Sequence, residues 1–234
     1  MNSLANNEKE LATMLAAARE RGVAISPIPV ALTPTDFDSA YRTQHAMLAL
    51  GNHAIAGWKV GAKSPQHPIR GAPLPAGAVL PSPALVQRRS YPLVGLELEI
   101  AFRFRRRFDT STHIYEEPEV LEAIGSVCAA IEIVSSRFSD WPDVDTLFQL
   151  ADLQNHGGLV VGEATSYTPD YPFVAPAVLF RFEGKDVVEQ KPANPAGDPR
   201  RLLTWAVNHC TSRGLAITPE TIITTGSYTR MRSE

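Results

Sequence analysis

The stretch that decides the fold is GLELEIAFRF, from Gly95 to Phe104. Its apolar residues alternate with Glu97 and Glu99, and a period of two is typical of a β-strand. The alternation places both carboxylates on one face of the strand, roughly 7 Å apart along the backbone. The stretch is apolar enough for a central strand, where unpaired carboxylates are costly. An ordinary surface strand can carry the same pattern, so the interpretation depends on what faces the pair.

A second apolar run, over residues 127–134, contains a single acid, Glu132, and predicts another buried strand. Two like charges at the spacing of Glu97 and Glu99 repel by roughly 2 kcal/mol at an effective dielectric near 20, and a third acid adds to this repulsion. A hard divalent cation removes the penalty. Three carboxylates with water suit Mg or Mn better than Zn. We therefore expect Glu97, Glu99 and Glu132 to bind Mg or Mn.

The segment IAGWKVGA, residues 55–62, predicts a strand with one charged residue, Lys59. Its ammonium group stands among apolar neighbours, and two interpretations are open. Lys59 can be an edge-strand residue whose long side chain reaches solvent. It can instead point into the acidic site, where it would bind a substrate carboxylate or relay a proton.

Two polar stretches in the second half of the chain are further candidates. The run from Asp152 to His156 precedes a glycine pair and an apolar strand. It supplies either hydrogen-bonding caps or part of a pocket wall, and Gln154 is the member that we predict to bind substrate. A last strand is expected over residues 222–225. It runs into a turn whose backbone donors suit a carboxylate, formed by Thr225, Gly226 and Ser227.

The remaining elements follow from periodicity and from proline and glycine. Helical spacing predicts a hairpin of two N-terminal helices and one later amphipathic helix. The chain between these helices contains a long proline-rich loop. The expected ranges are helices over residues 3–21, 35–50 and 199–214, a loop over residues 63–92 with one short strand near residues 78–80, and a strand over residues 173–182.

Length and composition describe a globular protein of 234 residues, with 44% hydrophobic and 20% charged residues. A chain of this length can bury a substantial core as one domain with a small appendage. We expect residues 1–52 to form the helical hairpin, packed on a catalytic body of residues 53–234. Cys128 and Cys210 are expected to be buried thiols, which fits a reducing compartment.

The net charge of −3 argues against a nucleic-acid or anionic-membrane partner. Four arginines interleaved with aromatics in RFRRRF, residues 103–108, could stack on single-stranded nucleic acid. The acidic total favours a charged strand end instead. The sequence has no secretory signal pattern and no window of transmembrane length, so we expect a cytoplasmic protein.

Taken in order, these segments resemble the fumarylacetoacetate hydrolase superfamily, and within it the short bacterial branch of 2-keto-4-pentenoate hydratases and related 2-oxo-acid hydratases and decarboxylases. The ordered set spans nearly the whole chain from about residue 33. The matching pieces are a helix with Tyr41 and Gln44 before GWKVGA, the glutamate pair in GLELEIAF, AIEIVSSRF, ADLQNHGGLVVG, the helix that ends at Gly214, and TTGSYT.

The resemblance implies an α+β fold, a mixed β-roll with a small N-terminal helical part. Glu97, Glu99 and Glu132 match the metal ligands of the family, Lys59 matches its site lysine, and the Thr225–Ser227 turn would lie near the substrate carboxylate. The implied activity is that of a metal-dependent lyase of the hydratase type. It would act on small 2-oxo or 2-hydroxydienoate acids such as 2-keto-4-pentenoate, by metal-stabilised enolate chemistry. Decarboxylation and C–C hydrolysis are the nearest alternatives. The resemblance also implies a homo-oligomer that takes part in aromatic-compound catabolism.

Two departures from the family pattern favour a second hypothesis, a catalytically weak partner subunit. Hydratases of this branch carry an acid before a proline in the loop after the lysine strand, but this chain has no acid between Lys63 and Tyr91. His67, or the run from Asp152 to His156, would then have to activate water. Relatives also continue past the TTGSYT segment into strands that close the roll.

Overall fold

The computed structural model describes residues 4–188, 191–229 and 231–233. Its helices are α1 (Asn6–Arg21), α2 (Phe37–Leu50), α3 (Glu117–Glu122), α4 (Thr146–Ala151) and α5 (Arg200–Thr211), with short 3-10 turns at Val30–Leu32, Ala76–Ala78, Arg88–Ser90 and Leu153–Asn155. Its strands are β1 (Ile55–Gly61), β2 (Arg70–Pro75), β3 (Val79–Pro81), β4 (Gly95–Phe104), β5 (Ile124–Val134), β6 (His156–Val161), β7 (Thr165–Ser166), β8 (Arg181–Phe182), β9 (Lys185–Asp186), β10 (Ile222–Ser227) and β11 (Arg232–Ser233).

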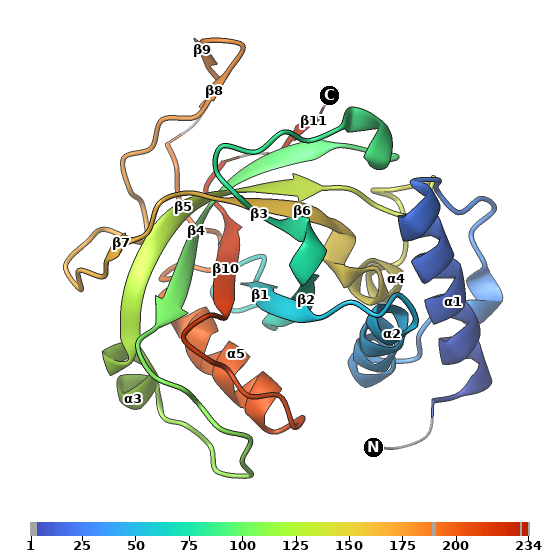
Figure 1. The fold of residues 1–234 in the computed structure, drawn as a ribbon, viewed down its shortest axis with the longest axis horizontal. Coiled ribbons are helices and arrows are strands. Elements are labelled where there is room, and N and C mark those ends of the chain that lie inside the picture. Colours follow the sequence, from blue (N-terminus) through green and yellow to red (C-terminus); the bar gives the residue numbers. More distant parts are fainter. Residues whose placement is uncertain (1–3, 189–190, 230, 234) are drawn as a thin grey trace.

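A single curled sheet forms the body of the protein (Figure 1). Its strands follow the spatial order β2-β1-β10-β4-β5-β6-β3, while β11 pairs with β4 and β7 with β5. The pairs β1–β10 and β3–β6 are parallel, and the other neighbours are antiparallel. β8 and β9 form a separate hairpin that projects from the body (Figure 1). The mixed, curled sheet with a few helices confirms the expected α+β fold with a mixed β-roll.

Strand β4 shows how alternation gives the sheet two different faces. Phe102 and Phe104 lie in a core on the outer side, where α5 covers the sheet. Ala101 belongs instead to a small inner cluster with Ala130 of β5. Full burial of a phenylalanine side chain stabilises a fold by about 1.5–3 kcal/mol. Phe102 and Phe104 therefore determine which face of β4 packs against α5. Glu97 and Glu99 share the side of Ala101 and therefore face the concave interior.

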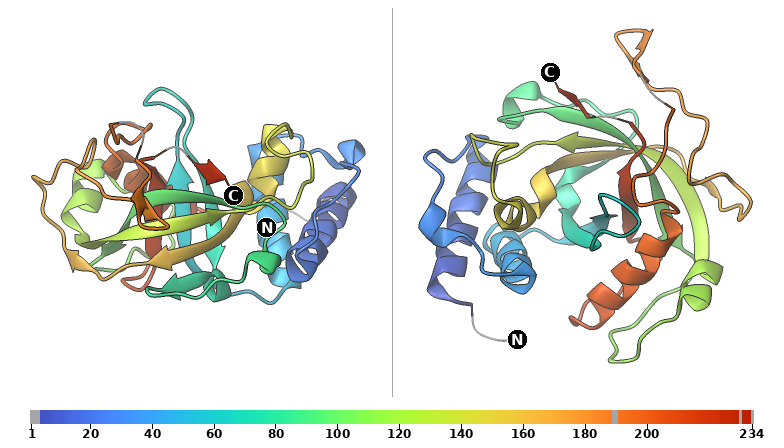
Figure 2. Two further views of the ribbon diagram at one scale, coloured as in Figure 1. Left: turned by 90° about the horizontal axis from the view of Figure 1, so that it is seen from above. Right: turned by 180° about the vertical axis from the view of Figure 1, so that it is seen from behind.

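The helices lie in two groups around the sheet (Figure 2). α5 packs on the outer core through Leu203 and Val207. α1, α2 and α4 share a second core, which contains Leu11 and Phe148. The N-cap of α2 is Asp36, whose side chain accepts a hydrogen bond from the backbone N–H of Ser39 at 2.7 Å, as expected of an N-cap aspartate. The expected helical pair is present. The boundary that we drew at residue 52 stays a prediction.

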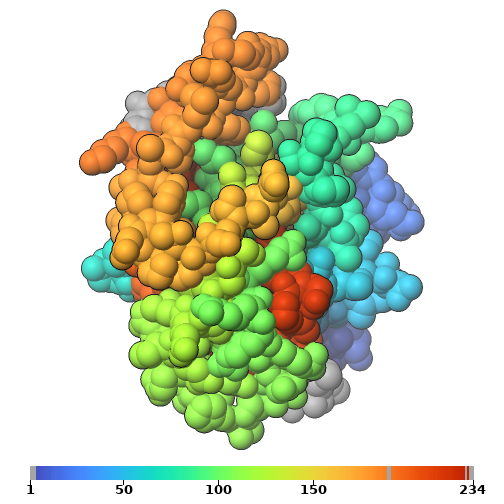
Figure 3. All heavy atoms as spheres, turned by 60° about the vertical axis from the view of Figure 1, so that its left-hand side comes forward, coloured from blue at the N-terminus to red at the C-terminus, as the bar shows by residue number. Residues whose placement is uncertain are grey.

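The segment between β6 and α5 differs from the expectation. The strand predicted for residues 173–182 is wrong: only Arg181–Phe182 pairs, with β9. Phe173 is buried because it packs against Phe102, with the ring centroids 5.4 Å apart, and Pro172 and Pro176 beside it disfavour sheet pairing. Figure 3 shows this segment, in orange, at the surface on the upper left of the view.

The segment predicted as a proline-rich loop contains a strand, β2, that the sequence analysis did not predict. β2 contains Pro73 and Pro75 and pairs with β1. It lies at the edge of the sheet, where a missing N–H breaks no ladder on the free side. Within the described ranges, no helix is long and apolar enough to cross a membrane.

Candidate active site

Three glutamates meet on the concave face of the sheet. Glu97 of β4 stands directly opposite Glu132 of β5, and Glu99 is two residues further along β4. One carboxylate oxygen from each of the three lies within 4.8 Å of the others. The alternation of β4 and β5, read from the sequence, thus brings together the acids that we predicted as metal ligands. Hard divalent cations prefer such oxygen ligands.

Glu132 is fully buried and only half satisfied. Its Oε1 accepts hydrogen bonds from Lys59 Nζ at 2.6 Å and from His156 Nδ1 at 2.9 Å. Its Oε2 is buried and has no partner among the described residues. Buried polar atoms are nearly always paired. An open carboxylate oxygen beside two further acids therefore fits a cation ligand, and the residues present suit the predicted metal.

Residues of β10 bind the side chain of Glu99. Its Oε2 accepts hydrogen bonds from the Thr224 hydroxyl and, at 3.2 Å, from the backbone N–H of Gly226. The turn expected to bind a substrate carboxylate thus supports a glutamate through Gly226. Thr225 is buried and donates to the carbonyl of Ile100 at 3.0 Å.

The electrostatics of the cluster favour a positive charge. Burial raises the pKa of Glu97 to about 8, and the charges of Glu132 and Glu99 add to the effect. Burial, followed by the charge of Glu132, also raises the pKa of Glu99 to about 8. Burial acts against the charged form of Lys59, but the three carboxylates outweigh it and raise its pKa. The lysine therefore remains an ammonium group, and the acids gain from any further cation.

The members of the polar run from Asp152 to His156 have different roles. Asp152 is fully buried and pairs with Arg137 at 2.5 Å. The carbonyl of Gln154 accepts from Lys59 Nζ at 3.1 Å. Three consecutive residues here have left-handed φ angles of 50°, 52° and 59°, which are uncommon outside glycine: Leu153, Gln154 and Asn155. This turn directs a backbone oxygen at the lysine, so the run is partly a cap and partly a pocket wall.

His156 is the residue that sequence reasoning did not connect with the metal site. Burial and the positive charges of Arg19 and Lys59 lower the pKa of His156 well below its usual range. The ring is therefore neutral, and its Nδ1–H donates to Glu132. The sequence shows His156 only as the residue before a glycine pair and an apolar strand; the pairing of that strand with the strand of Glu132 is visible in the structure alone.

A cavity of about 310 Å³ opens onto Glu97. Gln154 and Ser227, two predicted substrate-binding residues, line it, as do His67 and Arg70. Thr225 and Gly226 are not among the described lining residues, and neither are Asp152 and His156. Lys59 reaches the acid cluster through Glu132.

Solved structures of the fumarylacetoacetate hydrolase fold superpose on the curled sheet. The 4-oxalocrotonate decarboxylase from Pseudomonas putida G7, complexed with calcium and acetate, matches with a TM-score of 0.83 at 19% identity, over 100% of this chain and 92% of that one. The fumarylpyruvate hydrolase from Pseudomonas aeruginosa, in complex with Mn²⁺ and pyruvate, matches with a TM-score of 0.54 at 14% identity, over 76% and 79%. These likenesses concern the fold.

Curated proteins similar in sequence are 2-keto-4-pentenoate hydratases. The protein of Burkholderia vietnamiensis is 24% identical over 232 residues, which cover 95% of this chain and 87% of the relative. The protein of Paraburkholderia xenovorans is 27% identical over 233 residues, covering 94% and 84%. No protein-family model matches the chain. The resemblance to the fumarylacetoacetate hydrolase superfamily and its hydratases is confirmed, and the hydro-lyase interpretation agrees with these relatives.

Proposed function

We propose that the protein is a divalent-metal-dependent lyase of the hydratase type that acts on small 2-oxo or 2-hydroxydienoate acids, such as 2-keto-4-pentenoate. The observation that carries the proposal is the cluster of three glutamates within 4.8 Å, with one buried carboxylate oxygen left open beside a lysine. Glu97, Glu99 and Glu132 would hold the cation. All ligands are oxygens, which favours Mg or Mn.

A bound cation would supply the positive charge that stabilises an enolate of a 2-oxo acid. The protein side chains supply the rest. Lys59 keeps its proton beside Glu132 and is placed to hold or move a proton at the substrate. Ser227 and Gln154 line the adjoining cavity, where they can orient the carboxylate end of the substrate.

Addition of water needs a group that deprotonates it. Asp152 is engaged by Arg137, and His156 donates to Glu132. His67 lines the cavity, with its Nδ1 2.9 Å from Ser64 Oγ, and we propose it as the residue that activates water. Because Glu97 is the only acid among the described lining residues, conversion of enol to keto acid should outpace hydration. This observation favours decarboxylation as the second candidate function.

The first experiment measures the metal. Calorimetric titration of metal-free protein with Mg²⁺ or Mn²⁺ should show binding that Glu99→Gln weakens at least tenfold. Glu122→Gln removes an exposed acid at the end of α3 and serves as the matched control. Equal affinity in wild type and Glu99→Gln would remove the metal assignment.

The second experiment follows the products of a 2-hydroxydienoate by proton NMR in deuterated water. Deuterium at C3 in excess of a hydroxyl at C4 supports fast protonation with slow hydration. His67→Ala should lower hydration by at least tenfold and leave C3 exchange within a few-fold. Unchanged hydration in this variant would show that another group holds the water. No turnover at all in the metal-loaded wild type would support the catalytically weak partner subunit.

The resemblance carries two further proposals, assembly as a homo-oligomer and a part in aromatic-compound catabolism. The two buried free thiols, Cys128 and Cys210, support a third, a place in the reducing cytoplasm. Light scattering of the purified protein tests the first.

A further inference from the structure

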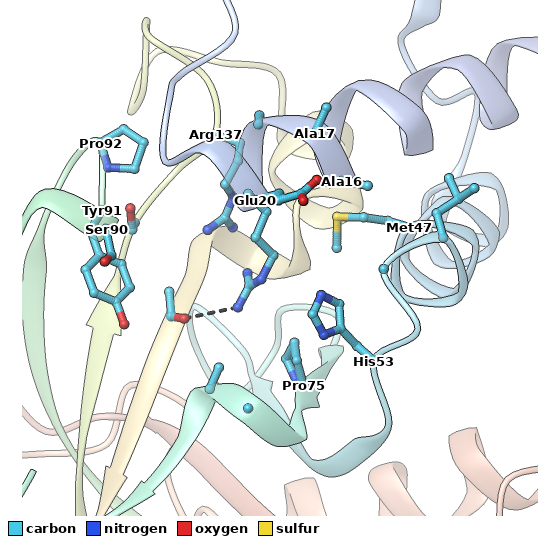
Figure 4. A pocket seen from close by; sticks show the side chains of 18 residues that line it. Ala16, Ala17, Glu20, Met47, His53, Pro75, Ser90, Tyr91, Pro92 and Arg137 are labelled. Carbon is cyan, nitrogen blue, oxygen red and sulfur yellow. Dashed lines mark hydrogen bonds between the residues drawn. The ribbon is translucent and has the colours of Figure 1, made fainter. Parts of the chain in front are cut away.

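Outside the candidate active site, a cavity of about 600 Å³ lies beside α1. Figure 4 shows Met47, His53 and Pro75 on one side of it and Tyr91 and Pro92 on the other. It is lined by residues of α1, the end of α2 and the start of β6. None of the three glutamates of the acid cluster lines it.

Two guanidinium groups face this cavity, those of Arg19 and Arg137. Arg137 is 3% exposed and fully engaged: it pairs with Asp152 and donates to the carbonyl of His156 at 2.8 Å. Arg19 donates to the carbonyls of His156 and Gly157 at 2.9 and 3.1 Å. Within the part of the chain that the structure describes, Arg19 has no ion-pair partner.

Arg19 is half-buried, and the charge that attracts it most is that of Asp152, which already pairs with Arg137. Burial, followed by the charge of Arg137, lowers the pKa of Arg19 to about 10, so Arg19 stays positively charged at neutral pH. Buried charges are normally paired because their desolvation costs several kcal/mol per ion. The two carbonyl groups that Arg19 contacts provide hydrogen bonds but no ion pair. Glu20, the single acid among the described lining residues, is exposed and forms no ion pair with Arg19.

A second polar group points to the same ligand chemistry. Ser135 lines the cavity and is fully buried, and its Oγ has no hydrogen-bond partner among the described residues. A hydroxyl group and a guanidinium group with unused N–H donors are the partners that a carboxylate takes in proteins. The opposite wall is apolar and includes Met47, Leu50 and Pro75.

We propose that this cavity is a second ligand site, which binds a small organic anion made of one carboxylate and an apolar body. The carboxylate lies against Arg19 and Ser135, and the apolar body lies against Met47 and Leu50. The inference does not depend on the proposed lyase activity. The carbonyl of His156 accepts from both arginines, and its ring donates to Glu132, so the cavity adjoins the back of the acid cluster.

The test uses the four methionines of the chain as reporters. Full-length metal-free protein carrying ¹³C-methyl methionine is titrated with sodium hexanoate, because removing the metal suppresses carboxylate binding at the acid cluster. The Met47 signal should shift and saturate. The signal of Met231, which lies against Gly95 of β4, should stay in place. A Met47 signal that does not move, or one that hexanol moves as far as hexanoate does, overturns the proposal.

Variants then identify the charge that binds the anion. Arg19→Gln should weaken hexanoate binding at least tenfold. Arg21→Gln removes the same charge from an exposed position at the end of α1 and should leave binding within twofold. Arg19→Lys keeps the positive charge and tests whether the loss of binding in Arg19→Gln reflects misfolding. The affinity of Arg19→Lys for hexanoate should stay within a few-fold of wild type. Equal weakening in Arg19→Gln and Arg21→Gln would overturn the site. Inorganic phosphate should bind at least tenfold more weakly than hexanoate, and equal binding would overturn the requirement for an apolar body.

Discussion

Two buried ion pairs lie close together in this protein and differ in completeness. Arg137 and Asp152 are 2.5 Å apart, and Lys59 and Glu132 are 2.6 Å apart. Both oxygens of Asp152 are engaged, one by the side chain of Arg137 and the other by its backbone N–H at 2.8 Å. Glu132 keeps one oxygen open, and two further acids face it.

The difference separates a structural contact from a chemical site. A buried pair is tolerated where every donor and acceptor is matched, and the Arg137–Asp152 pair meets that condition. It joins the end of β5 to the turn before β6. The Lys59–Glu132 pair does not meet the condition without a further cation, because one oxygen of Glu132 has no partner among the described residues and two further acidic side chains lie beside it. The incomplete pair is therefore where we expect binding and chemistry.

The largest expected effect follows from breaking the complete pair. Arg137→Met leaves Asp152 buried without a partner and should lower the free energy of unfolding by about 3–5 kcal/mol. Urea denaturation followed by circular dichroism measures it. Arg107→Met breaks an exposed pair with Asp109 and should change stability by no more than about 1 kcal/mol. Similar losses in the two variants would mean that the Arg137–Asp152 pair is not the structural contact described above.

Breaking the incomplete pair should act on chemistry more than on folding. Lys59→Met removes the only cation among the described residues that contacts the acid cluster, and turnover should fall about a hundredfold or more, the scale of one acid–base or positioning group. Metal affinity should stay within a few-fold, because all three glutamates remain. Steady-state kinetics with saturating Mg²⁺ measures the effect. Wild-type turnover in Lys59→Met would make this lysine a structural residue.

A smaller effect should appear in the pH dependence of stability. The raised pKa values of Glu97 and Glu99, about 8, mean that the folded metal-free protein holds protons that the unfolded chain releases above pH 4.5. The free energy of unfolding should therefore fall as the pH rises towards 8. His209 acts in the opposite direction below pH 6.5, because burial lowers its pKa to about 3.

The measurement therefore compares Tm at pH 6.5 and at about pH 8, in EDTA and in excess Mg²⁺. Between pH 6.5 and about pH 8 we expect the Tm of the wild-type protein to fall in EDTA. The fall should be smaller in excess Mg²⁺, and in EDTA it should be smaller for Glu99→Gln than for the wild type. A fall of equal size in wild type and Glu99→Gln would show that the acid cluster does not cause it.

The parts of the site that depend on local alternation were predictable. The pattern of β4 put Glu97 and Glu99 on one face, and the apolar run around Glu132 marked a second buried acid. The meeting of these acids with Lys59 depends on β10 lying between β1 and β4, and no local pattern encodes that arrangement. The contact of His156 with Glu132 and the hydrogen bonds from Arg19 to β6 also join residues far apart in the sequence, so no local pattern predicts them. β2 was missed because the prolines that mark a loop are also tolerated at a sheet edge.

The position of β10 also has a consequence for synthesis. Among the strands that support the acid cluster, β10 is the last to leave the ribosome, yet it pairs with β1 on one side and β4 on the other. Until Ile222–Ser227 is available, both earlier strands present unpaired edges, and such edges attract other chains. The nascent protein therefore has a window in which residues 1–221 have been made but the sheet is open at the centre. Chaperone capture and aggregation should be concentrated in that window.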